Sequence, residues 1–232
     1  SREAAGLYGE AVARIVDDPD TAAALVPTHP FGCKRPIIDQ GYFETFNRDN
    51  VTLVDLRKGG IRSITARGIC TEQADHDLDV IVFATGFDAM TGALRRIDVR
   101  GRDGVTLREV WDAEGPTSYL GLMVAGFPNL FIVQAPGSPS AATNFIAALE
   151  QHVEWIAECI GYLHTHGYRS IEAQAQAQHD WIEHTTALVE PTVLADPSCN
   201  SWYNGANVPG KKRRYMGYTA GIPEYRRHCD EV

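Results

Sequence analysis

The feature that most constrains this chain is a short, uninterrupted apolar run that ends at a glycine. Residues 80–84 read V-I-V-F-A, and Thr85 and Gly86 follow directly. A β-branched and aromatic run of this length is typical of a strand buried on both faces, as in the parallel sheet of an α/β protein. A glycine after such a strand lets the backbone approach a ligand closely, although an ordinary turn has the same pattern. We therefore expect an α/β fold with a buried strand over residues 78–84.

The rest of the chain alternates between helical and strand-like patterns. Asp18 precedes Pro19 as an N-cap, Gly167 ends the longest helical pattern, and Ser140 is the expected N-cap of that helix. Residues 192–232, rich in Gly, Pro and Asn, are expected to be loops. We expect helices over residues 1–18, 19–25, 39–46, about 142–166 and 172–190, strands over 51–54, 105–111 and 129–134, and a hairpin over 61–72.

Charge and composition exclude several classes of protein. The net charge of −9 argues against nucleic acid as a partner, and no apolar run approaches the length of a membrane span. The five cysteines are scattered without metal-ligand or C-x-x-C spacing, so we expect no metal site and reduced thiols, as in a cytoplasmic protein. The basic run 211–214 is interpreted as a solvated loop, and the glutamates at 150, 154 and 158 as the solvent face of the long helix.

Four stretches, in the same order, resemble the flavin-dependent Baeyer–Villiger monooxygenases. They are residues 30–36 (P-F-G-C-K-R-P), 80–94 (V-I-V-F-A-T-G-F-D-A-M-T-G-A-L), 126–144 (G-F-P-N-L-F-I-V-Q-A-P-G-S-P-S-A-A-T-N) and 201–211 (S-W-Y-N-G-A-N-V-P-G-K). No G-x-G-x-x-G loop, which would hold a dinucleotide pyrophosphate, occurs in the chain. The resemblance therefore implies the C-terminal part of a longer enzyme with two dinucleotide-binding domains, and the missing N-terminal portion would carry those loops.

The resemblance also divides the chain among the parts of that enzyme. Residues 1–28 would end a helical insertion, 29–85 would complete the NADP-binding domain, and 86–232 would complete the FAD-binding domain. The implied activity is insertion of one oxygen atom of O2 beside a ketone carbonyl, through a C4a-peroxyflavin, to give an ester or lactone. The implied cofactors are FAD and NADP.

Arg35 is the implied catalytic residue. A guanidinium stays charged near neutral pH and offers forked donors to the negative oxygens of the peroxide and of the tetrahedral adduct. Lys34 would contact the 2′-phosphate of NADP, for which a point charge suffices. Without the resemblance, two adjacent cations would be read as a solvated pair.

The remaining implied site residues belong to three other stretches. Trp202 would hydrogen-bond a cofactor ribose, since an indole N–H only donates. Further cofactor contacts are implied at Thr85, Gly86, Asn144 and Phe145, and the substrate pocket is implied at Ser140, Ala141 and Ala142.

Three alternatives remain open. Oxygenation of sulfur or nitrogen uses the same flavin chemistry but has less need of Arg35. A disulfide-reducing flavoenzyme would need a C-x-x-C motif, which this chain lacks. The chain by itself is also consistent with a non-catalytic fragment that folds without a cofactor.

Overall fold

The computed structural model describes residues 2–140 and 143–232, which form two compact units. Ser1–Phe31 and Pro36–Gly86 make up the first unit, and Gly32–Arg35 and Phe87–Val232 make up the second. The short segment 32–35 therefore packs with the second unit, although the residues on both sides of it belong to the first. Within the described ranges, no helix is both long enough and apolar enough to cross a membrane.

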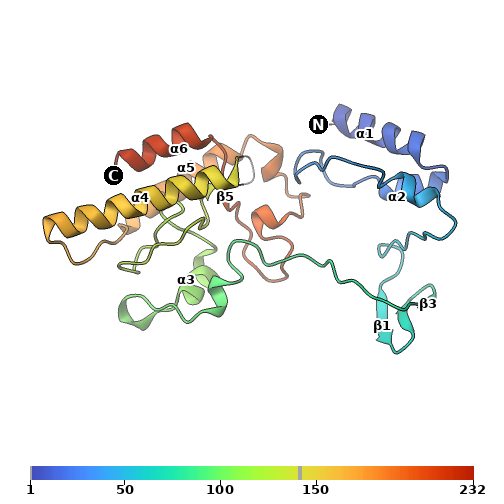
Figure 1. Ribbon diagram of the computed structural model, residues 1–232, viewed down its shortest axis with the longest axis horizontal. Coiled ribbons are helices and arrows are strands. Elements are labelled where there is room, and N and C mark those ends of the chain that lie inside the picture. The colour runs from blue at the N-terminus through green and yellow to red at the C-terminus, as the bar shows by residue number, and fades with distance from the viewer. Residues whose placement is uncertain (1, 141–142) are drawn as a thin grey trace. The chain divides into compact units, whose positions relative to one another are not determined.

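Two helices form the core of the first unit (Figure 1). They are α1, Arg2–Ile15, and α2, Pro19–Leu25. Asp18 caps α2 by accepting a hydrogen bond from the amide of Thr21 at 2.8 Å, as its position before Pro19 predicts. The buried side chains of this core are Val12, Val16, Ala22 and Phe43. Both predicted helices are confirmed, and the helix expected over 39–46 is reduced to a 3₁₀ turn at Glu44–Asn47.

A three-stranded antiparallel sheet completes the first unit. Its strands are β1, Ile61–Thr65, β2, Gly68–Thr71, and β3, Asp75–Asp77, in the order β1-β2-β3. Thr65 pairs with Gly68 across the turn, which confirms the predicted hairpin, and Ile69 pairs with His76. The third strand was not predicted, because only three residues of it pair.

The buried strand predicted over residues 78–84 is wrong. The run forms no strand, and Val82 and Phe83 are 83% and 70% exposed. No strand in the described part of the chain lies beside it, so its amide and carbonyl groups have no ladder partner. The strand expected over 51–54 is also irregular. Apolar composition alone does not form a strand when the neighbouring strand is not present.

The first helix of the second unit replaces a predicted strand. We expected a strand over 105–111, but α3 spans Leu107–Glu114. A reciprocal capping box begins it: the Thr106 hydroxyl accepts from the Glu109 amide at 3.2 Å, and the Glu109 carboxylate accepts from the Thr106 amide at 2.7 Å. The T-x-x-E spacing was visible in the sequence, and it decides the structure over the apolar alternation that follows.

The C-terminal helices are α4, Phe145–His166, α5, Ala175–Val189, and α6, Ile222–Asp230. The long helix and its stop at Gly167, which has φ 69°, are confirmed, as is the second helix. Asn144 rather than Ser140 caps α4, because its side chain accepts from the Ile146 amide at 3.0 Å. The α6 helix was missed, since residues 192–232 were expected to be loops. It runs beside α4 (Figure 1).

The buried face of α4 differs from the predicted one. The helical spacing of Phe145, Ile146, Val153 and Ile160 predicts one apolar face, but these side chains are exposed, whereas Ala148, Gln151 and His152 are buried. The stripe that packs inward is set by α6, whose Cys229 carbonyl accepts from the Trp155 indole at 3.0 Å. Of the expected apolar face, Ile156 packs against the core cluster, whereas these four residues have no cover among the residues that the structure describes.

Irregular backbone supplies most of the remaining core. The strand expected over 129–134 is absent; instead, the Ile132 amide donates to the Leu122 carbonyl at 2.8 Å. The buried side chains form two clusters, one around Leu120, Leu122, Trp181, Tyr218 and Tyr225, and one around Leu107, Trp111, Val124, Phe127, Ile132 and Ala135. A short parallel pair joins β4, Ser138–Pro139, to β5, Gly217–Tyr218. The other 3₁₀ turns are Leu94–Arg96, Arg102–Gly104, Val193–Ala195 and Trp202–Asn204.

Candidate functional site

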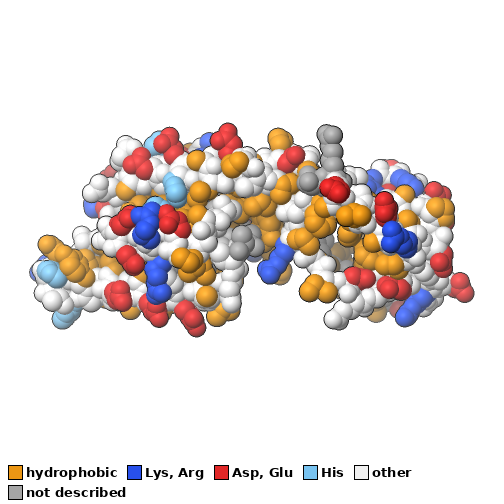
Figure 2. Space-filling view, turned by 90° about the horizontal axis from the view of Figure 1, so that it is seen from above, with side chains coloured by type: hydrophobic (Ala, Val, Ile, Leu, Met, Phe, Trp, Pro, Cys, Tyr) orange, Lys and Arg blue, Asp and Glu red, His pale blue; other side chains and the backbone are white. Residues whose placement is uncertain are grey.

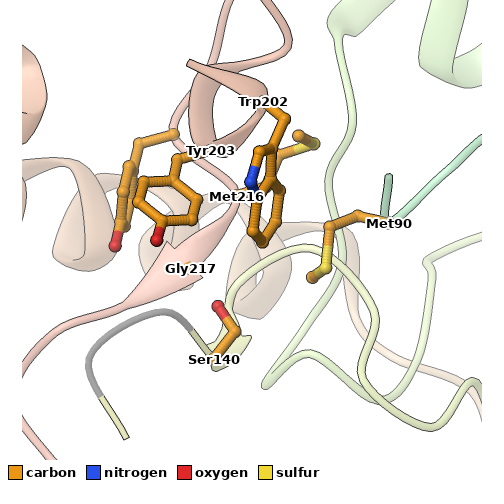
Figure 3. Close-up of a pocket in the computed structure, with 7 residues that line it drawn as sticks. Met90, Ser140, Trp202, Tyr203, Met216 and Gly217 are labelled. Carbon is orange, nitrogen blue, oxygen red and sulfur yellow. The ribbon is translucent and has the colours of Figure 1, made fainter. Parts of the chain in front are cut away.

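A small pocket in the second unit contains two of the predicted site residues. Ser140 and Trp202 line it, together with Met90, Tyr203, Tyr215, Met216 and Gly217. In Figure 3 the Trp202 indole stands between Tyr203 and Met90, and the Ser140 hydroxyl points toward these side chains. Trp202 is 39% exposed and Ser140 is buried. The structure thus brings together the third and fourth sequence motifs at one apolar and aromatic hollow with hydroxyl groups.

Backbone hydrogen bonds hold the two walls of the pocket together. The Met216 amide donates to the Tyr203 carbonyl at 2.8 Å, and the Gly137 amide donates to the Met216 carbonyl at 3.0 Å. The two walls approach closely at Gly217, because a Cβ atom there would lie 2.8 Å from the Ser140 hydroxyl oxygen and would displace that side chain. The loop that carries Trp202 is therefore fixed to the segment that carries Ser140.

A disulfide connects the loop of the predicted catalytic residue to the loop of Trp202. It joins Cys33 and Cys199, whose Cα atoms are 5.8 Å apart and which are both fully buried. Our expectation that all cysteines are reduced is wrong for this pair. The two residues are 166 positions apart in sequence, so no local spacing indicated the bond. Cys33 directly precedes Lys34 and Arg35, and Cys199 lies three residues before Trp202.

Lys34 and Arg35 project from the second unit as exposed side chains. Neither forms an ion pair or a side-chain hydrogen bond with any residue that the structure describes. Many other arginines of the chain are paired; Arg102, for example, contacts Glu172 at 2.6 Å. The two cations are therefore available to a negatively charged group from outside this chain.

A buried ion pair fixes the far end of the Trp202 loop. The Lys211 ammonium lies 2.5 Å from the Asp88 carboxylate, and the Lys211 side chain is almost completely buried. The Asn207 side chain donates to the Phe87 carbonyl at 2.9 Å. The interpretation of residues 211–214 as a solvated run is thus wrong for Lys211. Its signal was not local, because the partner aspartate lies in the second motif, 123 positions away.

The other predicted site residues are distributed along the chain. Asn144 begins α4 as its cap, and Phe145 is exposed on the first turn. Thr85 and Gly86 are exposed at the end of the first unit, and Gly86 has φ 83°, the left-handed conformation that favours glycine. Ala141 and Ala142 lie outside the described residues.

Tyr215 is a pocket residue that the sequence analysis did not identify. Its hydroxyl is buried and has no hydrogen-bond partner among the residues that the structure describes. Burial raises the pKa of Tyr215 to about 12, so the hydroxyl keeps its proton and can donate a hydrogen bond. Trp202, Tyr203 and Tyr218 are aromatic residues of the same stretch, so nothing in the local pattern distinguished this one.

Comparison with known proteins agrees on one family, although no protein-family model matches the chain. A Baeyer–Villiger monooxygenase of Pseudooceanicola batsensis is 41% identical over 222 residues, which cover 95% of this chain and 40% of that protein. A phenazine N-monooxygenase of Lysobacter antibioticus is 39% identical over 222 residues, with the same shares covered.

Solved structures give the same result. The closed crystal structure of cyclohexanone monooxygenase superposes with a TM-score of 0.92 at 44% identity, covering 99% of this chain and 42% of that one. The OTEMO complex with FAD and NADP has a TM-score of 0.85 at 40% identity and covers 98% and 42%. The fold is thus that of part of a flavoprotein monooxygenase.

The chain is homologous to the Baeyer–Villiger monooxygenases, as the four motifs predict. It spans about two fifths of the length of the relatives it matches.

Proposed function

We propose that this chain is part of an FAD- and NADPH-dependent Baeyer–Villiger monooxygenase, which inserts one oxygen atom of O2 beside a ketone carbonyl to give an ester or lactone. The observation that carries the proposal is the disulfide between Cys33 and Cys199, which ties the loop of Lys34 and Arg35 to that of Trp202. Two of the four family motifs are thereby held together, next to a third that supplies Ser140 to the pocket.

Arg35 is proposed as the catalytic residue. FAD, when bound, supplies the activated oxygen, and negative charge develops on oxygen atoms as the ketone carbonyl is attacked. An exposed guanidinium without an ion pair among the described residues is free to hold that charge with forked hydrogen bonds. Lysine at this position would provide a point charge without the fork, so it would be a poor substitute.

The cofactor contacts are proposed from the resemblance of the motifs to the family. Lys34 would bind the 2′-phosphate of NADP, and the Trp202 indole would donate to a ribose hydroxyl. The backbone of Thr85 and Gly86 and the first turn of α4, with Asn144 and Phe145, would approach the cofactors. In this scheme residues 1–28 end a helical insertion, 29–85 complete an NADP-binding domain, and 86–232 complete an FAD-binding domain.

The exposed apolar residues support a larger parent protein. Hydrophobic side chains are visible on both compact units (Figure 2). Val80, Val82 and Phe83 are exposed on the first unit, and Val153 and Ile160 are exposed along α4. Apolar surface of this kind marks an interaction site or an aggregation liability. We propose that the N-terminal portion of the parent chain covers it and supplies the pyrophosphate-binding loops, and that the isolated chain binds FAD weakly or not at all.

The test uses the full-length protein with FAD, NADPH and a cyclic or phenyl ketone in air. Ester or lactone is measured by mass spectrometry and NADPH oxidation by absorbance. We expect Arg35→Ala to abolish product while NADPH oxidation persists, and Arg48→Ala, which removes another exposed arginine, to leave both unchanged. Full product formation by Arg35→Ala would overturn the catalytic role.

One alternative is favoured by a specific finding. The similarity to a phenazine N-monooxygenase supports oxygenation of nitrogen by the parent enzyme, and oxygenation of sulfur belongs to the same alternative. The same assay with a thioether and an aromatic amine separates the two activities. Sulfoxide or N-oxide without ester from any ketone would favour this alternative, and Arg35 would then be a cofactor-binding residue.

A further inference from the structure

Two non-glycine residues adopt the left-handed backbone conformation where two irregular segments of the second unit meet. Leu120 has φ 55° and Gln134 has φ 60°. Their segments lie side by side, because the Ala135 amide donates to the Gly121 carbonyl at 3.0 Å. This conformation is unfavourable for residues with a Cβ atom, so it persists only where the surroundings hold it. The structure should therefore contain groups that restrain these two positions.

One pair of buried side chains contacts both residues. His152, on α4, accepts a hydrogen bond at Nδ1 from the Gln134 amide at 3.2 Å. Tyr225, on α6, donates from its hydroxyl to the Leu120 carbonyl at 2.5 Å. The two side chains meet each other, with His152 Nε2 at 2.8 Å from the Tyr225 hydroxyl. Both are fully buried.

The hydrogen bonds determine a single arrangement of protons. An amide can only donate, so His152 Nδ1 carries no proton and Nε2 carries the one of the neutral ring. Nε2 then donates a hydrogen bond to the Tyr225 oxygen, and the Tyr225 hydroxyl donates a hydrogen bond to the Leu120 carbonyl. Burial lowers the pKa of His152 to about 4, which keeps the ring neutral as this arrangement requires.

The segment that begins at Gln134 leads to the pocket. The Gln134 side chain accepts from the Ser138 hydroxyl at 3.1 Å, and Ser138 begins β4. The Gly137 carbonyl accepts from the Trp181 indole at 3.3 Å. Ser140, which lines the pocket, follows β4 directly. The direction in which the chain leaves Gln134 therefore sets the position of the pocket wall.

We infer that His152 and Tyr225 are positioning residues: by holding Leu120 and Gln134 in the left-handed conformation, they set the path of residues 134–140 and thus the placement of the oxygenated substrate. This inference rests on the proposed function. Neither side chain lines the pocket, so both act through the backbone of the segment.

The chain offers a matched pair of variants. Tyr225→Phe removes only the hydroxyl that bonds Leu120 and His152. Tyr218→Phe removes another fully buried hydroxyl from the same cluster, one that has no hydrogen-bond partner in the described part of the chain. A third variant, His152→Gln, keeps an uncharged donor on α4 and serves where Tyr225→Phe yields no folded protein.

The experiment uses full-length enzyme loaded with FAD, with rates expressed per bound FAD. The substrates are an unsymmetrical ketone, for the ratio of its two regioisomeric esters, and a prochiral thioether, for the ratio of sulfoxide enantiomers. We expect Tyr225→Phe to raise KM for the ketone about fivefold, to change kcat less than twofold and to change the product ratios about threefold. Tyr218→Phe should leave the ratios unchanged.

Hydrogen exchange provides a readout that is independent of activity. Amides in residues 134–138 should exchange about tenfold faster in Tyr225→Phe than in Tyr218→Phe. Unchanged product ratios and unchanged exchange would overturn the inference, even if the melting temperature fell. Absence of ester from the wild type would instead overturn the proposed function, while the sulfoxide ratio and the exchange rates would still decide the positioning role.

Discussion

Two apolar stretches of this protein differ in burial. Residues 80–84 are the most strand-like part of the sequence, yet they form no strand with any described residue and are mostly exposed. Residues 118–135 contain almost no regular structure, yet Leu122, Val124 and Ala135 are completely buried. The second stretch satisfies its backbone through turns and a few contacts between segments, such as the bond from Ile132 to Leu122.

The difference shows that apolar composition indicates which residues can be buried. Whether they are buried depends on which other segments of the protein pack against them. Residues 118–135 meet α3, α5 and α6 within the same unit. Residues 80–84 meet no strand among those that the structure describes. The comparison can be tested at one residue in each stretch.

The largest effect is expected from truncating a core residue of the irregular stretch. Leu122→Ala should lower the free energy of unfolding by about 3 kcal/mol, through lost apolar burial and the cavity left behind. Val82→Ala should change it by less than about 0.5 kcal/mol in this chain, because the side chain is exposed. Urea denaturation measures both variants. Equal costs in this chain would contradict the comparison.

The same two variants test the comparison between residues 80–84 and residues 118–135 further when they are made in the full-length protein. If the N-terminal portion covers residues 80–84, Val82→Ala should there cost about 1–2 kcal/mol, while the cost of Leu122→Ala should not change.

The second-largest effect is expected in the pH dependence of stability, through the buried side chain of His152. The pKa of His152 lies near 4 in the folded state and near 6.5 in the unfolded chain. The unfolded state therefore binds a proton first on acidification, so the contribution is complete above about pH 6.5 and lost as the pH falls toward 4. We expect a loss of roughly 3 kcal/mol, since each pKa unit is worth about 1.4 kcal/mol.

Urea midpoints measured between pH 7 and pH 4 test this expectation. His152→Gln should remove most of the pH dependence in that window. Burial also lowers the pKa of His184, so His184→Gln is the control, and it should remove the smaller part. An unchanged slope in His152→Gln would show that this histidine does not titrate as its burial indicates.

The smallest effect is expected at the N-cap of α4, which neighbouring residues form without a distant partner. Asn144→Ala should cost about 1 kcal/mol, because the first amides of α4 lose their cap. Asn50→Ala, at an exposed turn position without a side-chain hydrogen bond to any described residue, should be close to neutral. Thermal unfolding of both variants, each compared with the unmodified protein, distinguishes the two costs. A neutral Asn144→Ala would indicate that another group satisfies these amides.

Local sequence predicted those elements whose boundaries are made by neighbouring residues. The Asp18 cap, the hairpin at Arg67-Gly68 and the stop at Gly167 all appear in the structure where the sequence places them. Helix α3, where a strand was predicted, is also encoded locally, by the capping box of Thr106 and Glu109. The α6 helix was overlooked because the surrounding glycines and prolines suggested loops throughout.

The candidate site was predictable only in part. The motifs identified Ser140 and Trp202, which the structure places in one pocket. They did not identify Tyr215 in that pocket or the ion pair of Asp88 with Lys211. The former depends on which of several aromatic residues faces the pocket, and the latter joins residues from two motifs that lie far apart in the chain.

By itself, then, the sequence determined the family, through four motifs in order, and the helices and hairpin that short-range caps and turns specify. Only the tertiary structure decided that Cys33 bonds Cys199, that Lys211 is buried against Asp88, and that His152 of α4 is buried while much of the predicted apolar face is exposed. The physical reason is range: a cap or a turn is complete within a few residues, whereas burial and long-range pairing depend on which surface the fold brings opposite each side chain.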